Sequence, residues 1–400
     1  MAKRVVLAYS GGLDTSVAVR WLTDELGVEV IALGVNVGQD GGEIDADALI
    51  ARAKAAGAVE AIVVDARDEF ARDFCMPAMR ANALYEGRYP LVSALSRPVI
   101  VKHLVAAARE HGADAVAHGC TGKGNDQVRF EVSTRALAPD LDVIAPVRTW
   151  GMTREDSIRY AEARGIPITA TKEKLYSIDD NLWGRAIECG EMEDPWAVPP
   201  PGVWSLTAPS TTEPRDLVIG FDAGVPVSLD GATLPLVSLI NELQSAVGSY
   251  GWGRLDMVEN RRVGIKSRET YECPASLALI LAHGDLESIT LERDLAREKS
   301  RLEPRYAELV YDGLWFSPLK QALDAFIDDS QQHVTGEVRL HLEAGSCQVT
   351  GRRSDASLYD YGLATYDAED SFRHEDSAGF VRLWGLSVET WAARQARLGG

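Results

Sequence analysis

The sequence has few cysteines and no long apolar run. Its 400 residues include five cysteines, an odd number, and none of them form a Cys-x-x-Cys pair. Neither a disulfide framework nor a cysteine zinc site is therefore expected. The apolar run Val5 to Tyr9 is too short for a signal peptide, and no run approaches the roughly 18 residues of a membrane span. We expect a cytoplasmic protein with reduced thiols and no membrane partner.

Positive charge is also scarce. Lys and Arg total 41 against 60 Asp and Glu, for a formal net charge of −19. A nucleic-acid surface normally needs a basic stripe, so no nucleic-acid partner is expected. The seven histidines show no metal-binding spacing, and we expect no metal site built from protein side chains. Small anions remain possible ligands, because loop amides and helix N-termini bind them without a basic surface.

Apolar runs alternate with helix-period segments in the first part of the chain. Strands are predicted over residues 4–9, 28–35, 58–65, 113–118 and 142–146, and helices over 14–26, 43–57 and 98–111. Such alternation is typical of an α/β domain with a parallel, Rossmann-like sheet. We assign residues 1–170 to this domain.

The pattern changes to α+β after about residue 170. Six prolines between residues 194 and 214 predict a long loop. Hairpins are predicted over 217–229 and 337–350, and helices over 235–247, 274–283 and 387–398. We place a second domain at 171–370 and a C-terminal helical arm at 371–400. The last helix is amphipathic, and it packs either on another subunit or on its own domain.

The heptapeptide Ser10-Gly-Gly-Leu-Asp-Thr-Ser16 follows the first predicted strand and leads into a helix. Two glycines permit positive φ and leave no Cβ between the backbone and a phosphate. The helix start adds free N–H groups and a positive dipole end. Asp14 either holds Mg²⁺ on a pyrophosphate or caps the helix.

The spacing of this loop excludes two common nucleotide motifs. A Walker A sequence, G-x-x-x-x-G-K-[ST], occurs nowhere in the chain, and the loop is not G-x-G-x-x-G. It resembles instead the pyrophosphate loop of the N-type ATP pyrophosphatases. That resemblance implies transfer of AMP to a substrate oxygen, with release of pyrophosphate.

A second polar segment, residues 118–130, follows the predicted strand 113–118. In open α/β sheets, ligands bind at that edge. An amino-acid substrate needs an acid such as Asp126 for its ammonium, and donors such as Thr121, Asn125 or Arg129 for its carboxylate. The alternative is a solvated loop, which would not require the three glycines found here.

Segments along most of the chain resemble the argininosuccinate synthase family. They are residues 8–16, 85–90, 118–130, 177–181, 258–261, 264–268, 271–272, 307–313 and 357–359. The family joins citrulline to aspartate through a citrullyl-adenylate and releases AMP and diphosphate. The resemblance implies a nucleotide-binding domain, a synthetase domain, and a homotetramer formed through C-terminal helices. It also implies an ATP-dependent ligase of arginine biosynthesis, with Mg²⁺ held mainly through the nucleotide.

The same resemblance implies three groups of site residues. The ATP site would be Ala8, Tyr9, Ser10, Gly11, Gly12, Leu13, Asp14, Thr15, Ser16, Val35 and Gly119; the aspartate site Thr121, Asn125 and Asp126; and the citrulline site Tyr89, Asn125, Arg129, Ser177, Glu259 and Tyr271. Asp14, Asp126 and Arg129 would act in catalysis. Ala94 and Ala186 stand where some members have serine, so we assign neither position.

Three other functions fit the residues less well. A tRNA thiolation enzyme would need a reactive cysteine pair and a basic face, and a glutamine-dependent amidotransferase an N-terminal cysteine or a fused glutaminase. A nucleotide-binding regulator without catalysis would have a degraded amino-acid loop, whereas residues 118–130 are intact. The ureido oxygen of citrulline is a weak nucleophile, so the site is expected mainly to position it and to stabilise charge.

Overall fold

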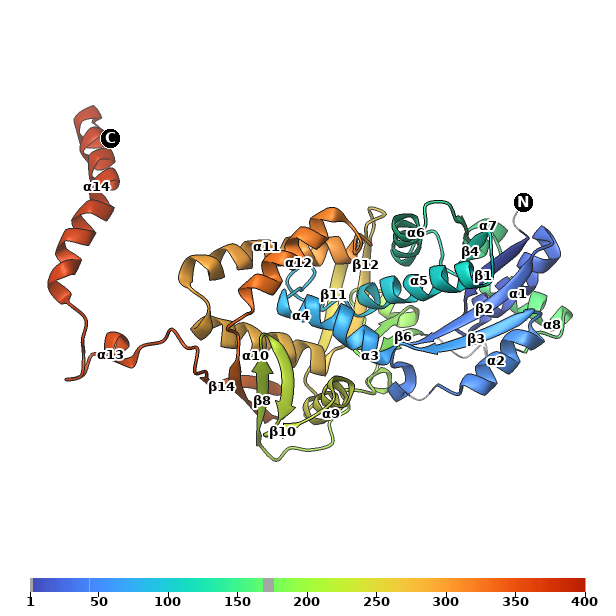
Figure 1. Cartoon of the computed structure of the whole chain (residues 1–400), viewed down its shortest axis with the longest axis horizontal. Coiled ribbons are helices and arrows are strands. Elements are labelled where there is room, and N and C mark those ends of the chain that lie inside the picture. The colour runs from blue at the N-terminus through green and yellow to red at the C-terminus, as the bar shows by residue number, and fades with distance from the viewer. Residues whose placement is uncertain (1–2, 43, 168–175, 400) are drawn as a thin grey trace. The chain divides into compact units, whose positions relative to one another are not determined.

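The computed structural model describes residues 3–42, 44–167 and 176–399 (Figure 1). Residues up to Ala356 form one compact unit, and residues from Ser357 form a second. The boundary predicted near residue 170 falls outside the described residues.

The first sheet is parallel, with strand order β3-β2-β1-β4-β5. Its strands are β1 (Arg4–Ala8), β2 (Glu29–Asn36), β3 (Glu60–Asp65), β4 (Ala115–Ala117) and β5 (Asp142–Ile144). The associated helices are α1 (Leu13–Leu26), α2 (Ala46–Ala55), α5 (Val92–Glu110), α6 (Asp126–Leu137), α7 (Pro146–Trp150) and α8 (Arg154–Ala163), with a 3₁₀ turn η1 (Gln39–Gly42). The predicted parallel α/β sheet is confirmed.

Both faces of this sheet are covered, which explains its continuous apolar strands. Val5 and Leu7 of β1 pack in one cluster with residues of α1, α2 and α8. Val6, which points to the opposite face, packs in another cluster with residues of α5. The strands β2 and β3 lie on one side of β1 and the strands β4 and β5 on the other, so the direction in which the chain adds strands to the sheet reverses at β1. The loops that follow β1 and β4 therefore flank the position where open sheets bind ligands.

Two antiparallel sheets follow. One has the order β10-β9-β8-β13-β14 and the other β11-β12-β7-β6. The first comprises β8 (Arg215–Asp222), β9 (Val225–Leu229), β10 (Ala232–Thr233), β13 (Gly336–Glu343) and β14 (Ser346–Arg353), and the second β6 (Ser177–Asn181), β7 (Gly184–Glu188), β11 (Arg254–Asn260) and β12 (Lys266–Glu272). Both predicted hairpins are confirmed in the first sheet. The second sheet was not predicted, and α5 packs against its strands β6 and β7.

The remaining elements are mostly helical. They are α3 (Arg67–Phe70), the π-helical turn η2 (Ala71–Cys75), α4 (Met76–Arg80), the 3₁₀ turns η3 (Gly190–Glu193) and η4 (Pro201–Val203), α9 (Leu236–Gly248), α10 (Pro274–Thr290), α11 (Arg293–Tyr311), α12 (Pro318–Ser330), α13 (Tyr361–Ala364) and α14 (His374–Leu398). Within the described ranges, no helix is both long enough and apolar enough to cross a membrane.

Two predicted helix starts were wrong. α5 begins at Val92, so Pro98 lies inside the helix and leaves the carbonyl of Ala94 without its usual N–H donor. Buried residues on both sides of Pro98, such as Leu95 and Val101, hold the helix together despite this loss. The last helix begins at His374 instead of Ser387, because the polar segment before Ser387 is also helical.

Candidate active site

A cleft of about 500 Å³ lies at the ends of β1 and β4. Its walls come from the loops after these strands, from α6, from the β11-β12-β7-β6 sheet, and from Tyr311 at the end of α11. All the predicted site residues line it except Gly11 and Ser16. A cavity of this size matches the range that small-molecule sites occupy.

The phosphate loop turns sharply at Gly11, which has φ +74°. Arg52 of α2 holds the turn, since its Nη1 donates to the Gly11 carbonyl at 3.1 Å. Ser16 is buried and lies 3.1 Å from the Tyr9 hydroxyl, so it supports the loop from behind. These two residues therefore shape the loop without lining the cleft.

The start of α1 faces the cleft. Gly12 is its N-cap residue and no side chain caps it, so the alternative role of Asp14 as the cap is wrong. The Asp14 side chain is exposed and lines the cleft. Ser10 and Thr15 also line it, with their hydroxyl oxygens 3.2 Å apart. The first turn thus presents amides, hydroxyls and one carboxylate to a ligand.

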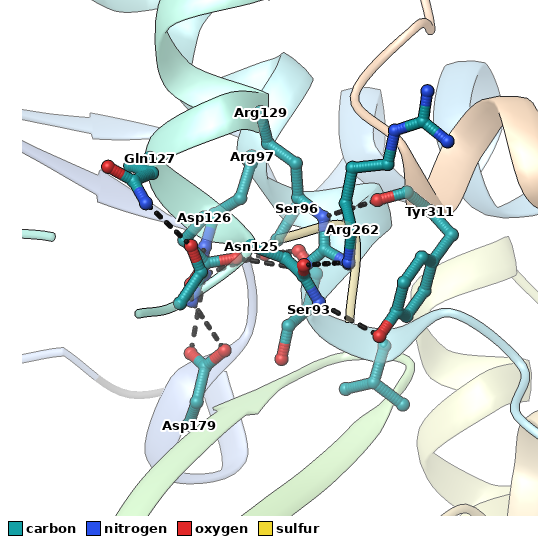
Figure 2. Close-up of polar contacts among 12 residues, drawn as sticks. Ser93, Ser96, Arg97, Asn125, Asp126, Gln127, Arg129, Asp179, Arg262 and Tyr311 are labelled. Carbon is teal, nitrogen blue, oxygen red and sulfur yellow. Dashed lines mark hydrogen bonds and ion pairs between the residues drawn. The ribbon is translucent and has the colours of Figure 1, made fainter. Parts of the chain in front are cut away.

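Asp126 begins helix α6 and is clamped by two arginines (Figure 2). Arg97 donates to its Oδ2 from Nη2 at 2.7 Å, and Arg129 donates to its Oδ1 from Nη1 at 2.8 Å. Burial raises the pKa of Asp126, but the two guanidinium groups outweigh burial and hold that pKa at about 2. Asp126 is therefore an anion throughout the neutral range.

Arg129 is fixed from two sides and still has a free donor. The residue is 4% exposed, and its Nε donates to the Tyr311 carbonyl at 3.0 Å. Its buried Nη2 has no hydrogen-bond partner among the described residues. A buried guanidinium N–H without a partner is costly, so a carboxylate bound beside it would gain a strong charge-assisted bond.

Asn125 connects Arg129 to the part of the cleft around Glu259. Its Nδ2 donates to the Tyr311 hydroxyl at 2.8 Å, and its Oδ1 accepts from the Arg262 backbone N–H at 2.8 Å (Figure 2). The Tyr311 hydroxyl in turn donates to Glu259 Oε2 at 2.7 Å. Tyr271 donates to the other oxygen of Glu259.

Glu259 is 3% exposed and lies among aromatic rings. Burial raises its pKa, while the hydrogen bonds from Tyr271 and Tyr311 oppose that rise. Tyr89 stacks on Tyr271, with ring centroids 4.2 Å apart. The result is a carboxylate held in a rigid aromatic frame, a site that suits an ammonium group.

One face of the four-stranded sheet forms the floor of the cleft. Strand pairing places Ser177 opposite Glu188, and Ala186 opposite both Asp179 and Tyr271. Facing residues in an antiparallel pair point to the same side of the sheet. All five residues line the cleft, so Ser177 lies on the same floor as Tyr271.

Several residues that line the cleft were missed in the sequence. They are Ser93, Arg97, Asp179, Glu188, Arg261, Glu269 and Tyr311. Tyr311 lies in the segment 307–313, Asp179 in 177–181 and Arg261 in 258–261, all of which carried the family resemblance, so that signal could have found these three. Arg97 pairs with Asp126 across 29 residues, a contact that no local pattern shows.

His118 does not line the cleft, although it follows β4 directly. Its ring is 1% exposed, stacks on Phe130 and accepts from the Cys120 backbone N–H. Burial lowers its pKa to about 4, so the ring is neutral near pH 7. Across the described part of the chain, no group of three or more His, Cys, Asp or Glu side chains is arranged to hold a metal ion.

The family resemblance implies a citrulline site around Glu259, and replacing Tyr311 with Phe should then weaken the use of that substrate selectively. The change removes the hydroxyl that donates to Glu259 and accepts from Asn125, a loss of about 1–2 kcal/mol, or about tenfold in kcat/KM for citrulline. Steady-state kinetics with each substrate varied in turn would measure this. Tyr306→Phe is the matched control, because its buried hydroxyl bonds to Asp324 outside the cleft. A loss of the same size in both variants would contradict the role of Tyr311.

The fold and cleft define a class of protein before any comparison. A parallel sheet with a phosphate loop at its switch point, joined to a pocket of carboxylates and arginines, is typical of an enzyme that uses a nucleotide to activate an amino acid. Two protein-family models match the chain. The Arginosuccinate synthase N-terminal HUP domain matches residues 4–167, and the Arginosuccinate synthase C-terminal domain matches residues 176–391. The chain therefore belongs to the argininosuccinate synthase family, which consists of carbon–nitrogen ligases.

Two solved structures that the chain resembles are distant from it in sequence. A U34-tRNA thiolase, NcsA, from Methanococcus maripaludis is 18% identical over 43% of this chain and 60% of that one, with a TM-score of 0.29. A predicted subunit of a tRNA methyltransferase from Methanocaldococcus jannaschii is 12% identical over 44% of this chain and 78% of that one, with a TM-score of 0.28. The chain thus spans less than two thirds of the thiolase, and neither likeness bears on function.

Proposed function

We propose that the chain condenses citrulline with aspartate in an ATP-driven reaction that releases AMP and diphosphate. One observation carries the proposal. A single cleft joins the phosphate loop to a buried arginine with a free donor and to a buried, hydrogen-bonded carboxylate. Two amino acids and a nucleotide are the ligands that this set of charges suits.

The first step is adenylation of citrulline. The amides at the start of α1 and the hydroxyls of Ser10 and Thr15 bind the phosphates and the departing diphosphate. Glu259 binds the citrulline ammonium, and Arg129 binds its carboxylate through Nη2. The ureido oxygen then attacks the α-phosphorus, and the bond to diphosphate breaks. The protein contributes mainly position and charge stabilisation.

The second step is attack by aspartate. Asp126 binds the aspartate ammonium, while Thr121 and Asn125 donate to its carboxylates. The amine attacks the ureido carbon, and AMP leaves with the oxygen that citrulline supplied. Adenylation is what makes that oxygen a good leaving group.

Mg²⁺ fits the cleft as a companion of the nucleotide. Asp14 is an exposed carboxylate in the first turn of α1, where an uncompensated anion would repel phosphates. It would hold the ion together with the phosphate oxygens, which is how proteins commonly bind Mg²⁺. The bound ion would neutralise charge on the departing diphosphate.

We also propose the domain division and assembly expected from the family. A nucleotide-binding domain at 1–170 and a synthetase domain at 171–370 would share the cleft, and an arm at 371–400 would join copies of the chain into a homotetramer in the cytoplasm. Helix α14 buries none of its residues, and Phe380, Leu383, Trp384 and Trp391 are all exposed on it. Sedimentation velocity on the full chain should give a tetramer, and deletion of the arm should lower the mass.

The activity test uses purified protein with Mg²⁺-ATP, citrulline and aspartate. Diphosphate release should require both amino acids, and argininosuccinate should form in equal amount. Omission of either amino acid is the control. Release that ignores the amino acids, or no release at all, would contradict the proposed function.

A further inference from the structure

The floor of the cleft contains a carboxylate pair that the steps above do not use. Glu188 ends β7, and Glu269 on β12 is the next residue in the register that pairs Thr270 with Ile187. Arg261 joins them, with its Nη2 at 3.0 Å from Glu188 Oε2 and at 2.6 Å from Glu269 Oε1. Glu188 and Glu269 thus share a single arginine.

Glu188 lies beside the substrate residues. It pairs with Ser177 across the β6–β7 hairpin and lines the cleft together with Asp126 and Glu259. Its side chain is 40% exposed, whereas that of Glu269 is only 4% exposed. Glu188 is therefore the member of the pair that a ligand in the cleft can reach.

The surroundings of Glu188 favour a proton on it near neutral pH. Partial desolvation inside the cleft and the neighbouring Glu269 raise its pKa to about 7, against the opposing effect of Arg261. Asp126 on α6 and Asp179 on β6 raise its pKa further, and the carboxylate of Glu259 on β11 also interacts with it across the cleft. A carboxyl group with a pKa near the working pH is well suited to accept and return a proton.

The second step of the proposed reaction requires such a group. Aspartate arrives as an ammonium ion, and its nitrogen has no lone pair until a proton leaves. Asp126 is a poor acceptor, because Arg97 and Arg129 hold its pKa at about 2. It can bind the ammonium but takes no proton from it at neutral pH.

We propose that Glu188 is the general base that deprotonates the aspartate ammonium, an inference that rests on the proposed function. The Glu188 carboxylate takes one proton, and the freed lone pair forms the C–N bond to the ureido carbon. The C–O bond to AMP breaks, and its electron pair stays on the AMP oxygen. The second proton lost by the attacking nitrogen passes to the departing AMP phosphate, so that the product is a protonated guanidinium.

The substitution Glu188→Gln tests the adenylation step and the aspartate step separately. Citrulline-dependent exchange of labelled diphosphate into ATP, which needs only adenylation, should stay within about threefold of the unsubstituted protein. Argininosuccinate formation should fall by about 100-fold, the size expected for removal of a general base. Glu191→Gln, at an exposed residue of η3 outside the cleft, is the matched control and should leave both rates unchanged.

The pH dependence provides a readout that a structural role would not change. In the unsubstituted protein, argininosuccinate formation should decline as the pH falls through about 7, because Glu188 becomes protonated. In Glu188→Gln the rate should instead rise about tenfold per pH unit, following the fraction of free amine. Glu269→Gln removes the like charge, so the pKa of Glu188 drops and the acidic limb should move to lower pH.

The outcomes distinguish this inference from the function on which it rests. If the unsubstituted protein makes no argininosuccinate, the proposed function fails. If it is active and Glu188→Gln loses exchange and synthesis together, Glu188 serves substrate binding or folding, and the base assignment is overturned. Full synthesis by Glu188→Gln, or an unmoved acidic limb in Glu269→Gln, overturns it as well.

Discussion

Replacing Asp126 with Asn should lower kcat/KM for aspartate by about 100-fold and leave the KM for ATP nearly unchanged. The carboxylate is the anion proposed to bind the aspartate ammonium, and it is ionised at all neutral pH values because its pKa is about 2. Asn keeps the shape but not the charge, and the loss of a buried charge-assisted contact is worth about 3 kcal/mol. Initial rates with aspartate and ATP varied separately would measure both effects.

The same substitution affects stability, so a matched control is needed. Arg97 and Arg129 both donate to Asp126; without that anion the buried Arg129 loses its ion-pair partner, whereas Arg97 keeps its pair with Asp179. A lower Tm is therefore expected for Asp126→Asn. Asp140→Asn removes an exposed carboxylate paired with Arg109 and should change neither Tm nor kinetics appreciably. An equal fall in kcat/KM for aspartate and for ATP would contradict the role assigned to Asp126.

The phosphate loop could be predicted because its conformation is determined by residues that are neighbours in the sequence. A strand, two glycines and a helix start are consecutive in the chain, and their conformation depends little on distant residues. The parallel sheet was predictable for a similar reason, since apolar runs such as 4–9 and 28–35 alternate with helix-period segments.

The floor of the cleft was not predictable in the same way. It depends on the register of β6, β7, β11 and β12, whose alternation is obscured by charged residues that face the cleft on both hairpins. Tyr311 bonds to Asn125 across 186 residues, so only the folded chain brings them together. The family resemblance identified Ser177, Glu259 and Tyr271 as site residues, but it did not identify Arg97 or the Glu188–Glu269 pair.

The predicted helix starts were wrong where tertiary packing outweighed the local sequence signals. Pro98 is a strong marker of a helix beginning, yet α5 starts six residues earlier, at Val92. Leu91 precedes it with φ +67°, a left-handed conformation that is unusual for leucine. The Asn181 side chain donates to the Val92 carbonyl and the Trp183 indole to the Pro90 carbonyl, and these bonds hold the unusual turn beside Tyr89.

Replacing Gly11 with Ala should weaken ATP binding by about 100-fold. A Cβ at this position would lie 2.6 Å from Cδ1 of the buried Leu49, so the Leu49 side chain or the loop must shift. The left-handed φ of +74° costs about 1–2 kcal/mol for alanine, and the overpacking adds about 1–3 kcal/mol, so the loop should move away from the phosphates. Gly27→Ala is the matched control: its φ is +66°, nothing lies within 4 Å of the added carbon, and it caps the other end of α1. Calorimetric titration with Mg²⁺-ATP should show normal binding for Gly27→Ala at a slightly lower Tm, whereas normal binding by Gly11→Ala would show that the loop is not the phosphate site.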